Sequence, residues 1–146
     1  MAEGSNALLA RTWFRNVWLP GGESTVHELM HPEAVGHLEG ADVHGPAEFL
    51  PARAALLDAF PDISVRVDDL IEQGDQVAVR WSVTATHGGD GLGIPASQQK
   101  VSFRGITWMR FAQGRVVEGW DAWNQGQLLT SLASAQIVAK TAADVA

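Results

Sequence analysis

Hydrophobic residues among the first sixty positions recur at steps of three and four, which is typical of amphipathic helices. This spacing predicts a helix over residues 6–18, ended by the Pro and Gly residues that follow it. Thr25 and Glu28 have the spacing of a capping box and predict a short helix that ends near residue 30. Residues 34–38 are expected to be extended. Pro46, suited to the first turn of a helix, predicts a third helix over residues 45–60.

After residue 62 the period changes to two, which predicts strands over residues 63–71, 77–86, 99–111 and 116–124. Residues 73–76 and 112–115 are the expected hairpin turns, and residues 87–97 form a Gly-rich loop. Residues 125–132 are compatible with a further helix, which the Ala-rich tail 133–146 either extends or leaves frayed. Helices followed by a four-strand meander predict an α+β fold, with a curved antiparallel sheet wrapped on the N-terminal helices. The concave face of such a sheet is a natural pocket for a small molecule.

Composition and charge limit the classes of protein to which the chain can belong. The chain has 146 residues, 46% hydrophobic and 18% charged, which predicts one globular domain over residues 1–146. A net charge of −7 with ten scattered basic residues argues against a nucleic-acid partner. No apolar run approaches the ~20 residues that span a bilayer, and residues 1–6 lack the features of a signal peptide. We therefore expect a cytoplasmic protein that does not enter a membrane.

Asp121, in the last predicted strand, is the first candidate for acid/base chemistry. Because strand residues alternate between faces, Asp121 and Trp123 are expected to share a face with Val117, opposite Trp120 and Asn124. A carboxyl held beside an indole on an apolar face is partly desolvated, and its pKa rises toward neutrality. The alternative is a solvated Asp at the rim, or one bonded to a neighbouring loop.

Other candidates lie on the remaining strands. His37 is a candidate catalytic donor to an oxyanion, and His87 is expected at the rim of the pocket. Arg80 either holds a polar group of the substrate or is a surface charge paired with Asp68 or Glu118 across strands. The aromatic candidates for substrate binding, with core packing as the alternative, are Trp81, Trp108, Trp123 and Phe49. The His residues show no metal-ligand spacing, so we predict no metal.

Eight segments, in order, resemble the SnoaL-like polyketide cyclases of the nuclear-transport-factor-2-like superfamily. They are Val35-Gly36-His37, Gly45-Pro46-Ala47-Glu48-Phe49, Ala59-Phe60-Pro61-Asp62, Val77-Ala78-Val79-Arg80-Trp81, Thr84-Ala85-Thr86-His87, Leu92-Gly93-Ile94-Pro95, Gly105-Ile106, and Gly114-Arg115-Val116-Val117-Glu118-Gly119-Trp120-Asp121. The resemblance covers a core of about residues 8–132. It implies a cone-shaped α+β barrel with a pocket between sheet and helices, commonly a dimer through the sheet.

The resemblance also implies a function. Family members include polyketide cyclases that close a ring by intramolecular aldol addition without metal or organic cofactor, using the Asp of the last strand, here Asp121, as acid/base. His37 and His87 match pocket positions of the family. Two positions depart from its pattern: Gly119 stands where the family often has His, and Leu19 follows Trp18 where it often has Asn.

The residues and the resemblance together predict a cofactor-independent acid/base enzyme, a homodimer, acting on a small hydrophobic, polyketide-like substrate by intramolecular aldol cyclisation. One alternative is an epoxide hydrolase-like or other hydrolase or isomerase activity on the same fold. Ser82 stands where an epoxide hydrolase would want an acid after Arg80, and the absence of Tyr disfavours a steroid isomerase. The other alternative is a module that binds a small molecule without catalysis.

Overall fold

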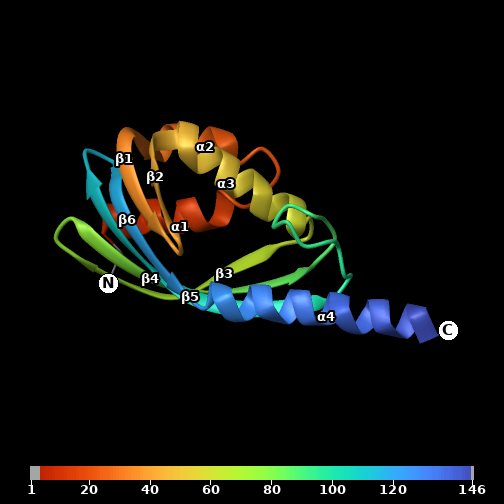
Figure 1. The fold of residues 1–146 in the computed structure, drawn as a ribbon. Coiled ribbons are helices and arrows are strands. Elements are labelled where there is room, and N and C mark those ends of the chain that lie inside the picture. The colour runs from red at the N-terminus through yellow and green to blue at the C-terminus, as the bar shows by residue number, and fades with distance from the viewer. Residues whose placement is uncertain (1–3, 146) are drawn as a thin grey trace.

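The computed structural model describes residues 4–145, and the side chains of residues 4–135 (Figure 1). Within that range the helices are α1 (Ser5–Asn16), α2 (Glu23–Leu29), α3 (Gly45–Ala59) and α4 (Gln125–Val145). The strands are β1 (Met30–Leu38), β2 (Ala41–His44), β3 (Ser64–Gln73), β4 (Gln76–Thr86), β5 (Lys100–Ala112) and β6 (Arg115–Trp123). Helices α1, α2 and α3 cover the concave face of the curved sheet (Figure 1). The α+β class predicted from the element order is confirmed.

The six strands of the described chain form one open sheet in the order β2-β1-β6-β5-β4-β3. The pairs from β6 to β3 are antiparallel, as the predicted meander requires, but β1 pairs with β6 in parallel. The antiparallel meander is therefore confirmed, and the parallel strand β1 makes the whole sheet mixed. Strand β2 was not predicted, because its four residues are too few to show an alternating pattern. Pro32, which has no N–H to donate, lies where the register between β1 and β6 shifts.

The start of α2 differs from the predicted capping box. The N-cap is Gly22, without a side-chain cap, and Thr25 is buried inside the helix. Gly21 takes a positive φ of 80°, a conformation that favours glycine, and turns the chain into α2. The tail that composition left undecided belongs to α4 as far as Val145, and residue 146 lies outside the described residues.

The core fills the space between the sheet and the helices. Strand β4 alternates as predicted: Val77, Val79, Trp81 and Val83 are buried, whereas Arg80 and Thr84 face outward. Apolar residues of α1, and Phe60 after α3, pack against this inner face. The burial of one face of β4 fixes which side chains reach the interior, because a slip by one residue would reverse both faces.

Gly105 lies between two tryptophans, paired with Trp81 on β4 and with Trp123 on β6. A Cβ at this position would lie 2.6 Å from Cζ2 of Trp81 and 2.7 Å from Cβ of Trp123. We expect Gly105→Ala to lower the free energy of unfolding by about 1–3 kcal/mol, because the added methyl overpacks this layer. Gly119→Ala is the matched control, since its Cβ would meet only the Trp108 carbonyl oxygen, at 3.8 Å. Urea unfolding measures both variants, and equal stabilities would contradict this packing.

Candidate active site

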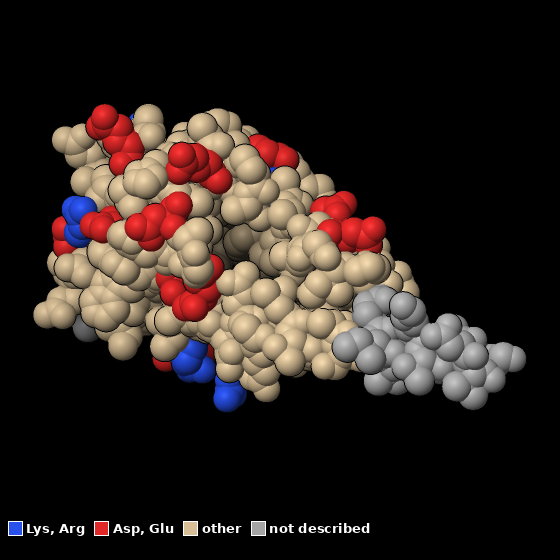
Figure 2. Space-filling view, in the orientation of Figure 1, with Lys and Arg blue, Asp and Glu red and all other residues tan. Residues whose placement is uncertain are grey.

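A cavity of about 220 Å³ lies between the concave face of the sheet and helices α1 and α3. The aromatic side chains on its wall are Trp13, Phe14, Trp18, Phe49, Trp81, Phe103 and Trp123. The polar and charged side chains on the wall are Glu39, Arg53, Thr107, Asp121 and Gln125. In the space-filling view a hollow opens between the helices and the sheet, with Asp and Glu side chains around it (Figure 2). An apolar cavity with few polar groups is the usual form of a small-molecule site.

Asp121 faces this cavity, but its neighbours on β6 differ from the predicted set. The register between β5 and β6 shifts so that Phe111 pairs with Val116 and Arg110 with Glu118. Val117 is therefore an extra residue in the strand, and the alternation changes phase there. Val116, and not Val117, lines the cavity together with Asp121. Strict alternation predicted the shared face of Asp121 and Trp123 correctly, because both lie beyond the bulge.

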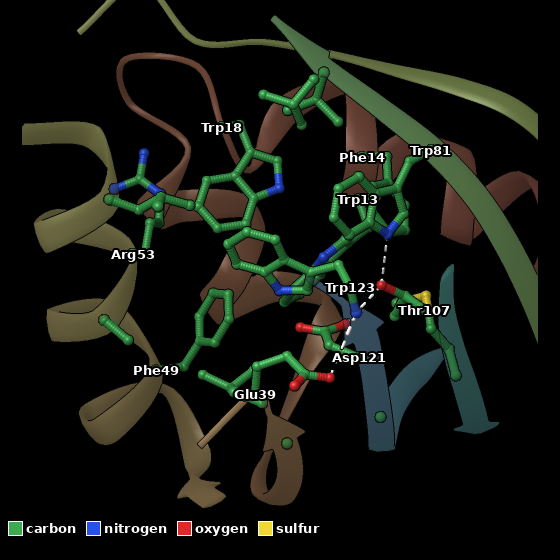
Figure 3. A pocket seen from close by; sticks show the side chains of 18 of the residues that line it. Trp13, Phe14, Trp18, Glu39, Phe49, Arg53, Trp81, Thr107, Asp121 and Trp123 are labelled. Atoms are coloured by element: carbon green, nitrogen blue, oxygen red, sulfur yellow. Dashed lines mark hydrogen bonds between the residues drawn. The ribbon is translucent and has the colours of Figure 1, made fainter. Parts of the chain in front are cut away.

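Two hydrogen bonds connect three strands at Asp121 (Figure 3). The Thr107 hydroxyl donates to Oδ1 of Asp121 at 2.6 Å. The indole Nε1–H of Trp81 in turn donates to Oγ1 of Thr107 at 2.9 Å. Both Trp81 and Thr107 are buried. Asp121 is therefore hydrogen-bonded to the neighbouring strand β5, and not to a loop as one of the alternatives in the sequence analysis had it.

Burial among apolar groups raises the pKa of the Asp121 carboxyl above its ordinary value. The Thr107 hydrogen bond acts in the opposite direction, because it stabilises the carboxylate, and the charge of Glu39 raises the pKa further. The net shift is upward. A carboxyl with a raised pKa accepts and returns a proton more readily near neutral pH than an ordinary Asp does.

Glu39 is an exposed carboxylate in the turn between β1 and β2, at the cavity wall near Asp121 (Figure 3). Its Oε1 accepts the backbone N–H of Trp123 at 3.4 Å. We expect Glu39→Gln to lower the pKa of Asp121, because the substitution removes a neighbouring negative charge. The acid limb of the pH–rate profile should then move to lower pH. Glu33→Gln, at an exposed site that does not line the cavity, is the control and should leave the acid limb in place. An acid limb that does not move in Glu39→Gln would contradict the effect of the Glu39 charge on Asp121.

His37 does not reach the cavity. It lies in β1 on the outer face of the sheet, stacked on Trp120 with ring centroids 5.5 Å apart. Its Nε2 is 2.8 Å from Oε2 of Glu118, and its Nδ1 is 3.0 Å from Oδ1 of Asp42. These two carboxylates, Glu118 first, raise the pKa of His37 by stabilising the imidazolium. The expected oxyanion donor is thus an ion-paired surface histidine, because its strand position puts its side chain opposite the pocket.

Arg80 and Trp108 also lie outside the cavity, which corrects their predicted place on its wall. Arg80 is a surface charge, 60% exposed, and its Nη2 is 4.0 Å from Oδ2 of Asp69. This is the surface alternative, with Asp69 as partner in place of Asp68 or Glu118. Trp108 is 49% exposed, and its indole N–H donates to Oε1 of Gln76. Both residues occupy the outward positions of their strands.

His87 is fully buried and does not lie at a pocket rim. Its Nδ1 accepts the backbone N–H of Ser97 at 3.3 Å and is 2.9 Å from the Ser97 hydroxyl. The ring packs on Phe60. Backbone hydrogen bonds join His87 to Gln98 and Gln99, so His87 closes the Gly-rich loop onto the core. The strand-to-loop position was predicted correctly, but its burial was not.

Trp81, Trp123 and Phe49 do line the cavity, and their part in substrate binding stays a prediction. The sequence analysis missed Thr107, Glu39, Arg53 and the tryptophans of the first helical region as site residues. For Trp13 a signal existed, because an aromatic residue on the apolar side of a helix that covers a concave sheet must face its interior. Trp18 belongs to the same predicted helix but lies just after the end of α1 at Asn16. Thr107 and Glu39 carried no such signal.

Among the described residues, no three His, Asp or Glu side chains gather as metal ligands. In the same part of the chain, no helix combines the length and hydrophobicity needed to cross a membrane.

Solved structures with this fold come from several bacteria. A SnoaL-like protein from Jannaschia sp. CCS1 matches with a TM-score of 0.84 and 24% identity, over 91% of this chain and 97% of that one. AclR from Streptomyces galilaeus, a proposed hydroxylase, is 31% identical with a TM-score of 0.77, over 88% and 96%. IdmH from Streptomyces antibioticus, a proposed polyketide cyclase, is 25% identical with a TM-score of 0.75, over 88% and 99%.

The comparison with curated proteins gave no match. The family model of SnoaL-like polyketide cyclases matches residues 8–132, which is most of the chain and includes the whole cavity wall. An NTF2-like protein from Burkholderia pseudomallei shares the fold, with a TM-score of 0.72. The chain therefore belongs to the SnoaL-like polyketide cyclase family.

Proposed function

We propose that this protein is an acid/base enzyme that closes a ring in a small, polyketide-like substrate by intramolecular aldol addition. The observation that carries the proposal is the Asp121 carboxyl, which lies on the wall of an aromatic cavity and whose pKa is raised by burial. Membership of the family supports a small-molecule-processing enzyme. The description of IdmH as a proposed polyketide cyclase supports the cyclase reading.

The chemistry needs one group that takes a proton and later returns it. In this mechanism the Asp121 carboxylate removes a proton from a carbon that lies between two carbonyl groups. The resulting enolate carbon attacks a second carbonyl carbon of the same molecule, and a carbon–carbon bond forms. The alkoxide that appears on that carbonyl takes the proton back from Asp121. Substrate and product are isomers, and Asp121 ends as it began.

The cavity wall suits a flat, conjugated substrate. Phe103 and Trp123 are stacked with centroids 4.9 Å apart, and Trp81 meets Trp123 edge-on. Aromatic faces of this kind bind planar apolar molecules, and they hold reacting carbons close together. Gly119 lines the cavity beside Asp121, and a Cβ there would meet only the Trp108 carbonyl oxygen, at 3.8 Å, so we propose a substrate with a substituent at that place.

Product analysis tests the reaction class. The purified protein is incubated with aromatic polyketide acid esters that carry an unclosed β-diketone side chain. The products are separated by chromatography, and their masses are determined by mass spectrometry. The proposal predicts a cyclic isomer of unchanged mass, or that isomer less one water. A product heavier than the substrate by one oxygen atom would indicate a hydroxylase, the activity proposed for AclR, and would contradict the cyclase proposal. Binding of these esters without any conversion would indicate a module that binds a small molecule without catalysis, and would contradict the cyclase proposal.

We also propose that the protein is a homodimer formed through the outer face of the sheet. Ile106, Trp108 and Trp120 are 48%, 49% and 39% exposed, and Trp108 pairs directly with Trp120 across β5 and β6. Large apolar side chains gathered on one face favour a partner that covers them. Sedimentation equilibrium is expected to give twice the chain mass for the wild type and one chain mass for Trp108→Glu. A monomeric wild type would contradict the proposal.

A further inference from the structure

We propose that Thr107, oriented by Trp81, is a positioning residue that reserves the Oδ2 oxygen of Asp121 for proton transfer to and from the substrate. The catalytic consequence rests on the proposed function. The arrangement of the three side chains rests on the structure alone, and it gives a role to Thr107, which neither the family pattern nor the sequence singled out.

The direction of the two hydrogen bonds follows from the chemistry of the groups. An indole N–H is a donor only, so Oγ1 of Thr107 must accept from Trp81. The single hydroxyl proton of Thr107 is then free to point to its other neighbour, Oδ1 of Asp121. Thr107 is buried, so water does not compete for this proton. The hydroxyl is thereby a fixed donor toward the carboxyl.

The sheet places these groups by register. Thr107 and Asp121 are direct partners across β5 and β6, whereas Trp81 is paired with Gly105, two positions along β5. The indole reaches Thr107 diagonally across Gly105. That path is open because Gly105 has no Cβ, which would lie 2.6 Å from the Trp81 ring. Gly105, Trp81 and Thr107 therefore form one unit that aims a hydroxyl at Asp121.

The two carboxyl oxygens are consequently different. Oδ1 accepts the hydrogen bond from the Thr107 hydroxyl. Protonation of Oδ1 would point a second hydrogen toward that donor, which disfavours it. Among the described residues, no hydrogen bond is made to Oδ2. A proton taken from a substrate carbon is thus stored on Oδ2 and returned from it. The Thr107 bond also fixes the plane of the carboxyl relative to the aromatic wall, which a proton transfer over a short distance requires.

Carboxyl ¹³C NMR over a pH range tests the arrangement without any need for turnover, and the Asp121 resonance is assigned by its loss in Asp121→Asn. Thr107→Val is expected to raise the pKa of Asp121, because the carboxylate loses a donor. Thr107→Ser should restore the wild-type midpoint. Trp81→Phe should raise the Asp121 midpoint less than Thr107→Val does. The double variant Trp81→Phe/Thr107→Val should have the same midpoint as Thr107→Val alone, because Trp81 acts through Thr107. Thr84→Val, an exposed strand threonine, is the matched control.

With a turnover assay in hand, Thr107→Val should lower kcat about tenfold with KM little changed, and Thr107→Ser should recover most of it. An Asp121 midpoint that Thr107→Val leaves unchanged would overturn the proposal. So would a Thr107→Ser protein that behaves like Thr107→Val, or additive shifts in the double variant. Expected midpoints in a protein without ring-closing activity would uphold the hydrogen-bond arrangement and reject the proposed function, so the two failures are distinguishable.

Discussion

Replacing Asp121 with Asn is expected to reduce kcat by about 10²–10⁴-fold, the usual contribution of one general acid/base. The amide has nearly the shape of the carboxyl and still accepts the Thr107 hydroxyl through its oxygen. It neither takes a proton from carbon nor returns one to an alkoxide. KM should change little, because the aromatic wall that binds the substrate stays in place. Steady-state kinetics of ring closure separate the two parameters.

Asp69→Asn is the matched control for this loss. Asp69 is 69% exposed, on the far side of the sheet from the cavity, and the same substitution there removes a carboxylate without touching the site. Its kcat should equal that of the wild type. If Asp121→Asn retains wild-type kcat, another group moves the proton and Asp121 is a structural residue.

Arg53→Met is expected to lower the free energy of unfolding by about 2–4 kcal/mol. Arg53 is only 3% exposed on α3, and it donates to the backbone carbonyls of Val17 at 2.6 Å and Leu19 at 2.9 Å. A third bond reaches Glu23 at 3.0 Å. Methionine fills much of the volume but leaves the two carbonyls without these donors. The segment after α1 carries Trp18 on the cavity wall, so ligand affinity should fall as well.

Two substitutions separate these contributions in urea unfolding followed by circular dichroism. Arg66→Met removes an arginine that is 78% exposed and paired with Asp68, and it should alter stability only slightly. Glu23→Gln removes an exposed partner of Arg53 while leaving both carbonyl bonds, and its effect should be much smaller than that of Arg53→Met. An Arg53→Met protein as stable as the wild type would show that the three bonds do not hold this segment.

The faces of the strands were predictable where alternation is undisturbed. On β4 the pattern placed Trp81 opposite Arg80, and the structure agrees, because one face of that strand packs on the helices. On β6 the pattern failed at Val117, because nothing in a single strand's sequence records a bulge that arises from its pairing with β5. The parallel pairing of β1 with β6 joins segments about eighty residues apart, which local periodicity does not report.

The candidate site was predictable in part for a related reason. Asp121 stood out because an ionisable residue next to large apolar ones in a strand is unusual. Thr107 gave no such signal: its hydroxyl matters only because β4 and β6 bring Trp81 and Asp121 to either side of it. His37 has a reactive side chain and a matching motif, yet the pleat of β1 turns it to the outer face. Residue type and motif indicate a site, but register decides which side chains share it.

Deuterium uptake from heavy water at the acidic carbon of the substrate measures the proton transfer itself, before ring closure. We predict that the wild-type protein accelerates this uptake, that Asp69→Asn does so equally, and that Asp121→Asn does so about 10²–10⁴-fold less. Equal uptake with the wild type and Asp121→Asn would contradict the assignment of Asp121 as the base in this cavity.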